Sequence, residues 1–397
     1  MRSVFAMNSR VVVFAKRRIS GLPSAAVPAV YPNINRKQLK RGTGGRSSFN
    51  GQVVTVFGGG GFVGKYVLNE LAKTGTQVVI PFRGDFFEVQ RLKVIGDLGQ
   101  VQFRKFDLRD EESVFECLRH STAVINLIGK DIETNNFSFE KVHAIGAQTI
   151  ARCVREAGIQ RFLHVSTANA SPRPTPHLLK SGSGFLRSKW KGEQLVRQEM
   201  PSAIIVRPTD IHGLDDNFCQ YFARWQRRQY GKVPLFRGGF HSYKQPVFVK
   251  DVAQAVVQAL QDPNAPANTY ELFGPRRYTL RALVEYINRC IQKPEEEGFR
   301  VTNLRWSPSF MARVYLFSAL KGLFKYPSIS LERLERECVS DVRQENTLGF
   351  EDLGICAEPL EDKWEYHLMQ WRRQSYYGEE VSEFVQTERP PQQPIVQ

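Results

Sequence analysis

The stretch Val53–Gly64, with the sequence VVTVFGGGGFVG, decides the fold of this chain. A short β-branched, apolar run ends in glycine, and apolar residues then recur at helical spacing, which predicts a strand, a tight turn and the start of a helix. Gly58, Gly61 and Gly64 have the spacing G-x-x-G-x-x-G. Glycine permits a positive φ in the turn, and the helix start offers N–H groups to a pyrophosphate. The stretch predicts a dinucleotide-binding site; the alternative is a glycine-rich loop without a ligand.

Strands alternate with helices for about 150 residues after this stretch. Apolar strand-like runs at 53–57, 77–82, 101–106, 123–128, 161–166 and 203–207 are separated by helical patterns. This alternation predicts the α/β class, with a doubly wound parallel sheet whose cofactor crevice lies at the carboxyl ends of the strands. We expect a Rossmann domain over 39–275, with part of a smaller lobe in 210–245, a mixed C-terminal lobe over 276–386, and a tail over 387–397.

The positive charge of the chain is concentrated at its beginning. The 397 residues carry a net charge of +15, and ten of the positive charges fall within the first 46 residues, where no acidic residue occurs. The remainder has a net charge of +5, which is ordinary for a globular protein. The basic composition is therefore poor evidence for nucleic-acid binding, and we expect no nucleic-acid partner.

Residues 1–38 have the composition of a mitochondrial transit peptide followed by a basic arm. They lack acids, are rich in Arg, and contain only short apolar runs such as 11–15. A disordered basic arm is the alternative, and a secretory signal is disfavoured because Lys16 follows the apolar run directly. The six cysteines are scattered without a C-x-x-C pair, so we expect no metal site. No apolar run is long enough to span a membrane, so any membrane contact is expected to be peripheral.

Several strand ends carry side chains that suit a nucleotide. Arg83 follows the second strand, where an acid would bind a ribose 2′-hydroxyl and an arginine suits a 2′-phosphate; this favours NADP(H) over NAD(H). A solvated loop arginine is the alternative. Asp107 follows the third strand and can accept the adenine amino proton or cap the next helix. Leu127 and Ile128 can pack against the adenosine ribose or belong to the core, and Ser166 is expected at the nicotinamide end of the crevice.

Four further segments carry a family resemblance: 106–110 (FDLRD), 126–129 (NLIG), 206–213 (VRPTDIHG) and 245–253 (QPVFVKDVA). With the glycine stretch, they resemble the extended, atypical short-chain dehydrogenase/reductases, a family that includes nucleotide-sugar epimerases and dehydratases. The resemblance covers roughly residues 53–292.

Active members of that family use a tyrosine and a lysine in the pattern Y-x-x-x-K, which places both side chains on one helix face. In this chain Lys189 is kept, but Phe185 stands at the tyrosine position. Phenylalanine has no ionisable proton, so the resemblance implies that the usual acid/base is missing and that no residue is catalytic. Lys189 can still bind ribose hydroxyls. The residues expected to contact the nucleotide are Gly58, Gly59, Gly60, Gly61, Phe62, Val63, Gly64, Arg83, Asp107, Leu108, Leu127, Ile128, Gly129, Ser166, Lys189 and Pro208.

A narrower resemblance rests on 40–50 (KRGTGGRSSFN), 95–100 (IGDLGQ) and 349–355 (GFEDLGI). These segments are similar to a family of NADPH-binding accessory subunits of mitochondrial respiratory complex I. The resemblance implies a tightly held NADPH with a structural role. It also implies a peripheral position on the matrix side of the inner membrane, with other subunits of the matrix arm and quinone module as partners. Gly60 stands where that family usually has threonine, which could loosen the packing of the cofactor.

Residues 308–326 have the pattern of a basic amphipathic helix with an aromatic-rich apolar face. Such a helix can lie in a membrane interface or dock on a partner, and a core helix of the smaller lobe is the alternative. Two other functions stay open at this point. One is an active mitochondrial NADPH-dependent reductase in which His212, or a water held by Ser166, replaces the missing tyrosine. The other is a binding module that senses the NADPH/NADP ratio.

Overall fold

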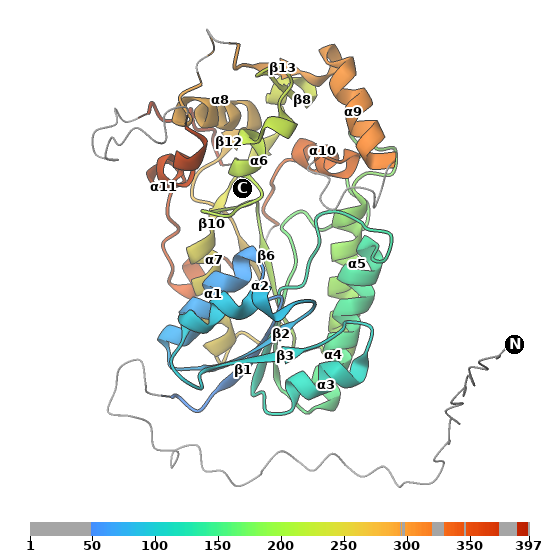
Figure 1. Cartoon of the computed structure of the whole chain (residues 1–397), viewed down its shortest axis with the longest axis vertical. Helices are drawn as coiled ribbons and strands as arrows, with labels where there is room; N and C mark the ends of the chain where they lie inside the picture. Colours follow the sequence, from blue (N-terminus) through green and yellow to red (C-terminus); the bar gives the residue numbers. More distant parts are fainter. Residues whose placement is uncertain are drawn as a thin grey trace, which may run out of the picture.

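The structure is a computed structural model that describes residues 49–293, 295, 298–319, 329–344, 347–372 and 387–395. The predicted transit peptide and basic arm (1–38) lie outside these residues, as does the second part of the predicted amphipathic helix (320–326). Figure 1 shows the arrangement of the described part: a sheet with helices on both faces, and a smaller lobe beyond one end of the sheet.

A seven-stranded parallel sheet forms the centre of the larger domain, with the strand order β11-β6-β5-β4-β1-β2-β3. The order reverses between β1 and β4, and this switch point opens a crevice at the carboxyl ends of the two strands. The predicted doubly wound sheet is confirmed. The strands are β1 (Val53–Phe57), β2 (Gln77–Phe82), β3 (Val101–Lys105), β4 (Ala123–Asn126), β5 (Arg161–Val165), β6 (Ile204–Pro208) and β11 (Thr269–Leu272).

Helices cover both faces of the sheet and bury two separate cores (Figure 1). On one face Leu68 of α1 and Val256 of α7 pack in the same cluster as Ile80 of β2. On the other face Ile150 of α4 and Val196 of α5 share a cluster with strand residues of β4 and β5. The helices of the larger domain are α1 (Phe62–Lys73), α2 (Phe86–Gln90), α3 (Glu111–Leu118), α4 (Gly146–Glu156), α5 (Gly184–Glu199) and α7 (Val249–Gln261).

A π-helical turn, η2 (Glu140–Ile145), leads directly into α4. The turn contacts α5 at Gly192, where an added Cβ would lie 2.1 Å from the carbonyl oxygen of His143. Only glycine allows this close approach, because any side chain would collide with the backbone of the turn. π-helical turns are frequent at functional sites, and this one carries His143 into the crevice region.

The smaller lobe has its own core, built around Trp364, whose ring stacks on Tyr286 at a centroid distance of 5.8 Å. The segment 217–230 contains the short α6 and a 3-10 turn, η3 (Trp225–Arg227). The helices of the lobe are α6 (Cys219–Ala223), α8 (Leu280–Cys290), α9 (Pro308–Ala319), α10 (Leu331–Cys338) and α11 (Glu361–His367). Its short strands are β8 (Val233–Leu235), β9 (Tyr243–Lys244), β12 (Tyr278–Thr279) and β13 (Val301–Asn303), and β7 (Ile211–His212) pairs with β10 (Val247–Phe248) where the lobe joins the sheet domain.

Helix α9 is only half packed into the lobe. Phe310 and Val314 are buried in a small cluster, whereas Tyr315 and Leu316 are more than half exposed. In the described ranges no helix is both long and apolar enough to cross a membrane. Part of the segment predicted as a tail lies against the lobe, because the backbone N–H of Gln393 donates to the carbonyl oxygen of Arg277 at 2.8 Å.

Candidate functional site

A cavity of about 370 Å³ lies between the carboxyl ends of the strands and the smaller lobe. It brings together ten of the sixteen residues that the sequence predicts as nucleotide contacts. These are Gly58, Gly61, Phe62, Val63, Gly64, Leu127, Gly129, Ser166, Lys189 and Pro208. The other six do not line the cavity: Gly59, Gly60, Arg83, Asp107, Leu108 and Ile128.

The glycine turn forms one wall of this cavity. Gly58 has a φ of +82°, and an added Cβ would lie 3.0 Å from the carbonyl carbon of Leu127. At Gly64 an added Cβ would lie 2.5 Å from the carbonyl oxygen of Gly59, so no side chain fits there. Gly61 precedes α1 and has no side chain that could cap the first N–H groups of the helix. The turn therefore has the shape and the free donors that a pyrophosphate needs.

Lys189 and Ser166 meet at the carboxyl end of β5. The Lys189 ammonium donates to the carbonyl oxygen of Val165 at 3.2 Å. Burial lowers its pKa to about 8, although Asp131 and Glu193 act in the opposite direction. The Ser166 hydroxyl is buried and has no hydrogen-bond partner within the described ranges. A buried hydroxyl and an incompletely neutralised ammonium that both face a cavity are groups that a polar ligand would satisfy.

Phe185 lies on the helix face that also carries Lys189, at the position that the resemblance assigns to a tyrosine. Its ring is buried and contacts His143 edge-on at a centroid distance of 5.0 Å. The guanidinium of Arg336 lies over the ring at 4.1 Å. The Phe185 side chain therefore presents a hydrocarbon ring, covered by a fixed cation, where an active family member presents a hydroxyl.

His143 is a residue of this site that the sequence did not single out. Its Nε2 accepts from the Lys130 backbone N–H at 3.0 Å, so the ring proton is on Nδ1, which donates to the Ser188 hydroxyl at 2.8 Å. Burial, with the nearby Lys189 charge, lowers the pKa of His143 to about 2. The imidazole is thus neutral, and both of its nitrogens are occupied.

Helix α10 closes the side of the cavity opposite the glycine turn. Arg336 donates to the Asp131 carboxylate and to its carbonyl oxygen, both at 3.2 Å. Burial raises the pKa of Asp131, but Arg336 and Arg333 outweigh it, and the net shift is downward. Arg333 lies over the Tyr221 ring at 3.7 Å. No local pattern predicts this wall, because Asp131 and Arg336 are 205 positions apart in the chain.

Arg83 belongs to a group of cations at the edge of the cavity, in which Lys130 lines the cavity and Arg83 and Arg109 do not. Arg83 and Arg109 lie over the Phe137 ring at 4.9 and 4.3 Å from its centroid, and Lys130 lies at 5.7 Å. Burial lowers the pKa of Lys130, and the Arg83 charge adds to the effect. The three positive charges around the Phe137 ring repel one another, and a phosphate group placed among them would reduce this repulsion and accept hydrogen bonds from them.

The remaining predicted contacts have local partners. The Asp107 carboxylate accepts from the Arg109 backbone N–H at 3.0 Å, and Asp110, not Asp107, caps α3. Leu108 and Ile128 pack against the core beside α4, which is the alternative left open for Ile128. An added Cβ at Gly60 would meet only the Val89 side chain, at 3.4 Å. The turn therefore has room for a side chain at this position, and glycine in place of threonine leaves no gap in the packing of the turn. A nucleotide-binding role for these residues stays a prediction.

Comparisons with known proteins give the family. Residues 54–272 match the NAD dependent epimerase/dehydratase family. Over 369 residues the chain is 40% identical to the mitochondrial NADH dehydrogenase (ubiquinone) 1 alpha subcomplex subunit 9 of Mus musculus, covering 91% of this chain and 92% of the mouse protein. The chain belongs to the subunit 9 family. It is also 38% identical to the mitochondrial NADH-ubiquinone oxidoreductase 40 kDa subunit of Neurospora crassa, over 90% of this chain and 89% of that protein.

The fold of the subunit 9 family is shared with enzymes of the wider group. A solved structure described as MoeE5 in complex with UDP-glucose and NAD aligns with a TM-score of 0.55 at 15% identity, covering 80% of this chain and 97% of that chain. At this identity the likeness shows the fold alone. The larger domain is therefore a dinucleotide-binding domain of the epimerase/dehydratase type.

Proposed function

We propose that this chain is a non-catalytic accessory subunit of mitochondrial respiratory complex I and that it holds NADP(H) for structural reasons. The observation that carries the proposal is Phe185. Its helix presents Lys189 to the cavity, as nucleotide binding requires, but the ring beside it has no proton to give. A bound NADP(H) would bring a hydride into the cavity, and the Phe185 ring, at the position of the family's tyrosine, supplies no proton to accompany it.

The substrate side of the cavity supports the same conclusion. A substrate would have to reach the face of Phe185, where the Arg336 guanidinium lies at 4.1 Å and is fixed by Asp131. His212, the other histidine considered as a donor, does not line the cavity. It is buried between Phe248 and Trp364, and burial lowers its pKa to about 3.

The choice of NADP(H) over NAD(H) rests on the cations around Phe137. We assign the 2′-phosphate to Arg83, with Arg109 beside it, because both guanidinium groups lie over the same ring at the carboxyl ends of β2 and β3. Arginine suits this role because its planar fork can bind two phosphate oxygens at once.

The named relatives give the partners. They are subunits of mitochondrial NADH:ubiquinone oxidoreductase, and the similarity extends over about nine-tenths of each chain. We therefore propose that this chain binds other subunits of the matrix arm and quinone module, on the matrix side of the inner membrane, after a transit peptide within residues 1–38 has directed it there.

Thermal unfolding of the purified protein tests the nucleotide assignment. NADPH should raise the melting temperature, because a ligand at a hundredfold excess over its Kd stabilises the folded state by about 2.7 kcal/mol. NADH should do so only at much higher concentration. Arg83→Gln should reduce the difference between NADPH and NADH in the concentration needed to raise the melting temperature. Lys73→Gln, which changes an exposed lysine at the far end of α1, should leave this difference unchanged. No shift with NADPH would contradict the proposal.

The absence of turnover needs a separate measurement. The protein is incubated with NADPH and a panel of carbonyl compounds, and absorbance of the reduced nicotinamide is followed. We expect no consumption beyond the rate without protein. Sustained consumption that is lost in Lys189→Met would instead favour an active reductase.

A further inference from the structure

A second cavity, of about 580 Å³, lies in the smaller lobe, away from the glycine turn. It is formed where α9 meets the segment after α6 and the loop before β13. Its lining consists of Ala223, Trp225, Arg228, Gln229, Tyr230, Gly231, Lys293, Phe299, Ser309, Phe310, Arg313 and Trp371. None of these residues has a part in nucleotide binding.

In the described part of the chain, the charged side chains that line this cavity are all positive. Arg228, Lys293 and Arg313 line it, and no Asp or Glu does so among the residues that the structure describes. The three cations come from three different elements, so their proximity is a property of the fold. Burial lowers the pKa of each, and in each case a neighbouring arginine charge lowers it further. Like charges gathered in a partly buried cavity are unfavourable unless an anion binds among them.

Two of the cations have donor groups without a partner. Arg228 is only 6% exposed; its two terminal nitrogens donate to Asn288 and to the Gly231 carbonyl oxygen, but its Nε is buried with no acceptor in the described part of the chain. The Arg313 Nε and the Trp371 Nε1 are buried and unpartnered in the same sense. All of these atoms are donors. Unpartnered N–H donors from residues that line a cavity with three cations are chemically matched to an oxyanion.

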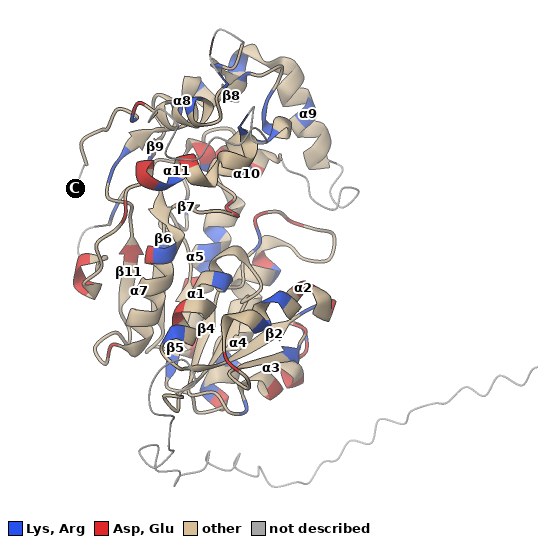
Figure 2. Ribbon diagram, turned by 60° about the vertical axis from the view of Figure 1, so that its left-hand side comes forward, with Lys and Arg blue, Asp and Glu red and all other residues tan. Residues whose placement is uncertain are grey.

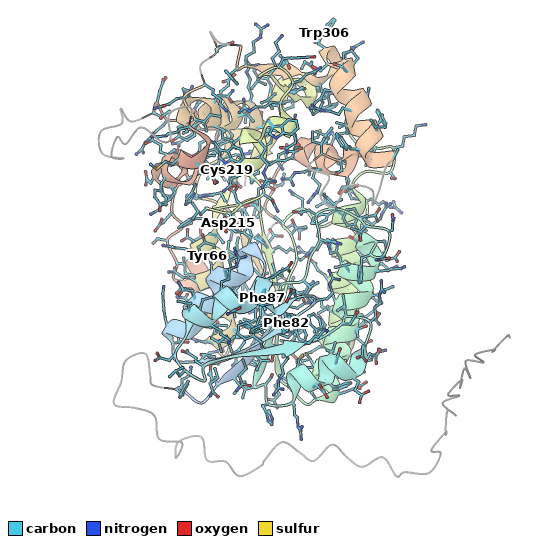
Figure 3. All side chains as sticks on the ribbon, viewed as in Figure 1. Tyr66, Phe82, Phe87, Asp215, Cys219 and Trp306 are labelled. Atoms are coloured by element: carbon cyan, nitrogen blue, oxygen red, sulfur yellow. The ribbon has the colours of Figure 1, made fainter. Side chains whose placement is uncertain are left out.

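The rim of the cavity is aromatic. Trp225 is 72% exposed and Tyr230 is 93% exposed, and both line the opening. Trp306, 82% exposed, stands just before α9 at the same end of the molecule, where it points away from the ribbon (Figure 3). Figure 2 shows a basic stretch (blue) on α9, the helix that contains Arg313. Exposed Trp and Tyr beside basic residues are typical of surfaces that lie at the headgroup level of a membrane.

We propose that this cavity binds a phosphate ester, the headgroup phosphate of an anionic phospholipid, and so attaches the smaller lobe to a membrane surface. Lys293 and Arg313 contact the phosphate from two sides, and Arg228 contributes its charge from the buried part of the cavity. Trp225 and Tyr230 enter the headgroup layer. The inference does not depend on a nucleotide in the first cavity.

Flotation of the full chain with phosphatidylcholine vesicles, with and without phosphatidylglycerol, tests the proposal. Lys293→Gln is the main variant, because the Lys293 ammonium lies over the Phe299 ring, 5.6 Å from its centroid, and makes no ion pair within the described part of the chain, so its loss should not disturb the fold. Arg305→Gln is the matched control, since it removes an exposed charge at the same end of the lobe but outside the cavity lining. Melting temperatures with NADPH are recorded for both, so that a failure of the nucleotide site is seen separately.

We expect binding only to vesicles that contain phosphatidylglycerol. Lys293→Gln should weaken it about fivefold or more, and Arg305→Gln about twofold at most. Equal losses of vesicle binding in the two variants would overturn the proposed site, because they would indicate a general attraction of the lobe to a charged surface. No loss of vesicle binding in either variant would also overturn it. Inorganic phosphate is the second arm. If it raises the melting temperature of the parent but not of Lys293→Gln, while vesicles do not bind, the anion site is supported and its ligand is a soluble phosphate ester.

Discussion

At the residue scale, Lys189 lowers the stability of the nucleotide-free protein but supports the binding of the nucleotide. Its pKa falls from 10.5 to about 8 through burial, so the folded protein without ligand bears a cost for keeping it charged at neutral pH. Lys189→Met should therefore stabilise the nucleotide-free protein by roughly 1–2 kcal/mol and abolish the NADPH-dependent rise in melting temperature. A lysine with a purely structural role would lose stability on this substitution and would not affect nucleotide binding.

The same group makes stability depend on alkaline pH. Between about pH 8 and 10.5 the unfolded chain keeps the Lys189 proton that the folded chain has released, so stability rises with pH across this window. The contribution should be absent in Lys189→Met. Urea unfolding of both proteins across the window measures the difference, and parallel curves would show that the lysine titrates normally.

Asp131 makes the opposite contribution, at acid pH. Arg336 and Arg333 lower its pKa in the folded state, so its ion pair adds stability above the unfolded pKa, about 4, and this is lost as pH falls through the folded value. Asp131→Asn should be less stable than the parent at neutral pH, and the gap should close in acid. We would measure thermal unfolding from neutral to acid pH; a gap that does not depend on pH would mean that the carboxylate charge is irrelevant.

At the element scale, the turn between β1 and α1 tolerates side chains very unequally. Gly64→Ala would place a Cβ 2.5 Å from the Gly59 carbonyl oxygen, so the backbone must move and the pyrophosphate cradle is distorted. Gly60→Ala has room and is the matched control. We expect Gly64→Ala to lose nucleotide binding by about a hundredfold, and Gly60→Ala to retain it. Titration of NADPH fluorescence measures both, and equal affinities would argue against a cradle.

A buried charge network joins α5, β6 and β11 to the segment after α10. Arg207 of β6 pairs with Glu193 at 2.7 Å and with Glu271 at 3.1 Å, and it donates to the Gln344 side chain at 2.9 Å. Arg207→Met would leave two buried carboxylates without their cation, which costs roughly 3–5 kcal/mol.

Denaturant unfolding measures that loss. Arg152→Gln breaks an exposed pair with Glu111 and should change stability by less than about 1 kcal/mol. A similar effect of the two substitutions would show that the Arg207 network contributes no more than a surface pair.

At the scale of the whole molecule, the sheet was predictable and the second wall of the site was not. The alternation of strands and helices from Val53 onward predicts a parallel sheet, and the parallel direction of the strands gathers the glycine turn, Ser166 and Pro208 at one edge. These residues lie at the ends of strands or just after them, so a local pattern finds them. Asp131 lies two residues after a predicted contact, Gly129, and could have been found in the same way.

The contribution of α10 could not be predicted from local pattern. Arg336 reaches Asp131 only because the smaller lobe folds back over the sheet, and a lone arginine on a charged helix gives no signal of that contact. The same holds for the second cavity, whose cations come from three segments that are separate in the sequence. His143 is a third case, since the π-helical turn that carries it is indistinguishable from a helix by periodicity.

The nucleotide retained by the native protein tests most directly whether the first cavity holds a cofactor without using it. Complex I is purified from mitochondrial membranes that contain this chain, the protein is denatured under conditions that preserve reduced nicotinamide, and the released nucleotides are separated and quantified. We predict about one NADP(H) per chain, unchanged in amount and oxidation state after prior incubation of the complex with NADH and quinone. Absence of NADP(H), or its oxidation during turnover, would contradict a structural role for the bound nucleotide.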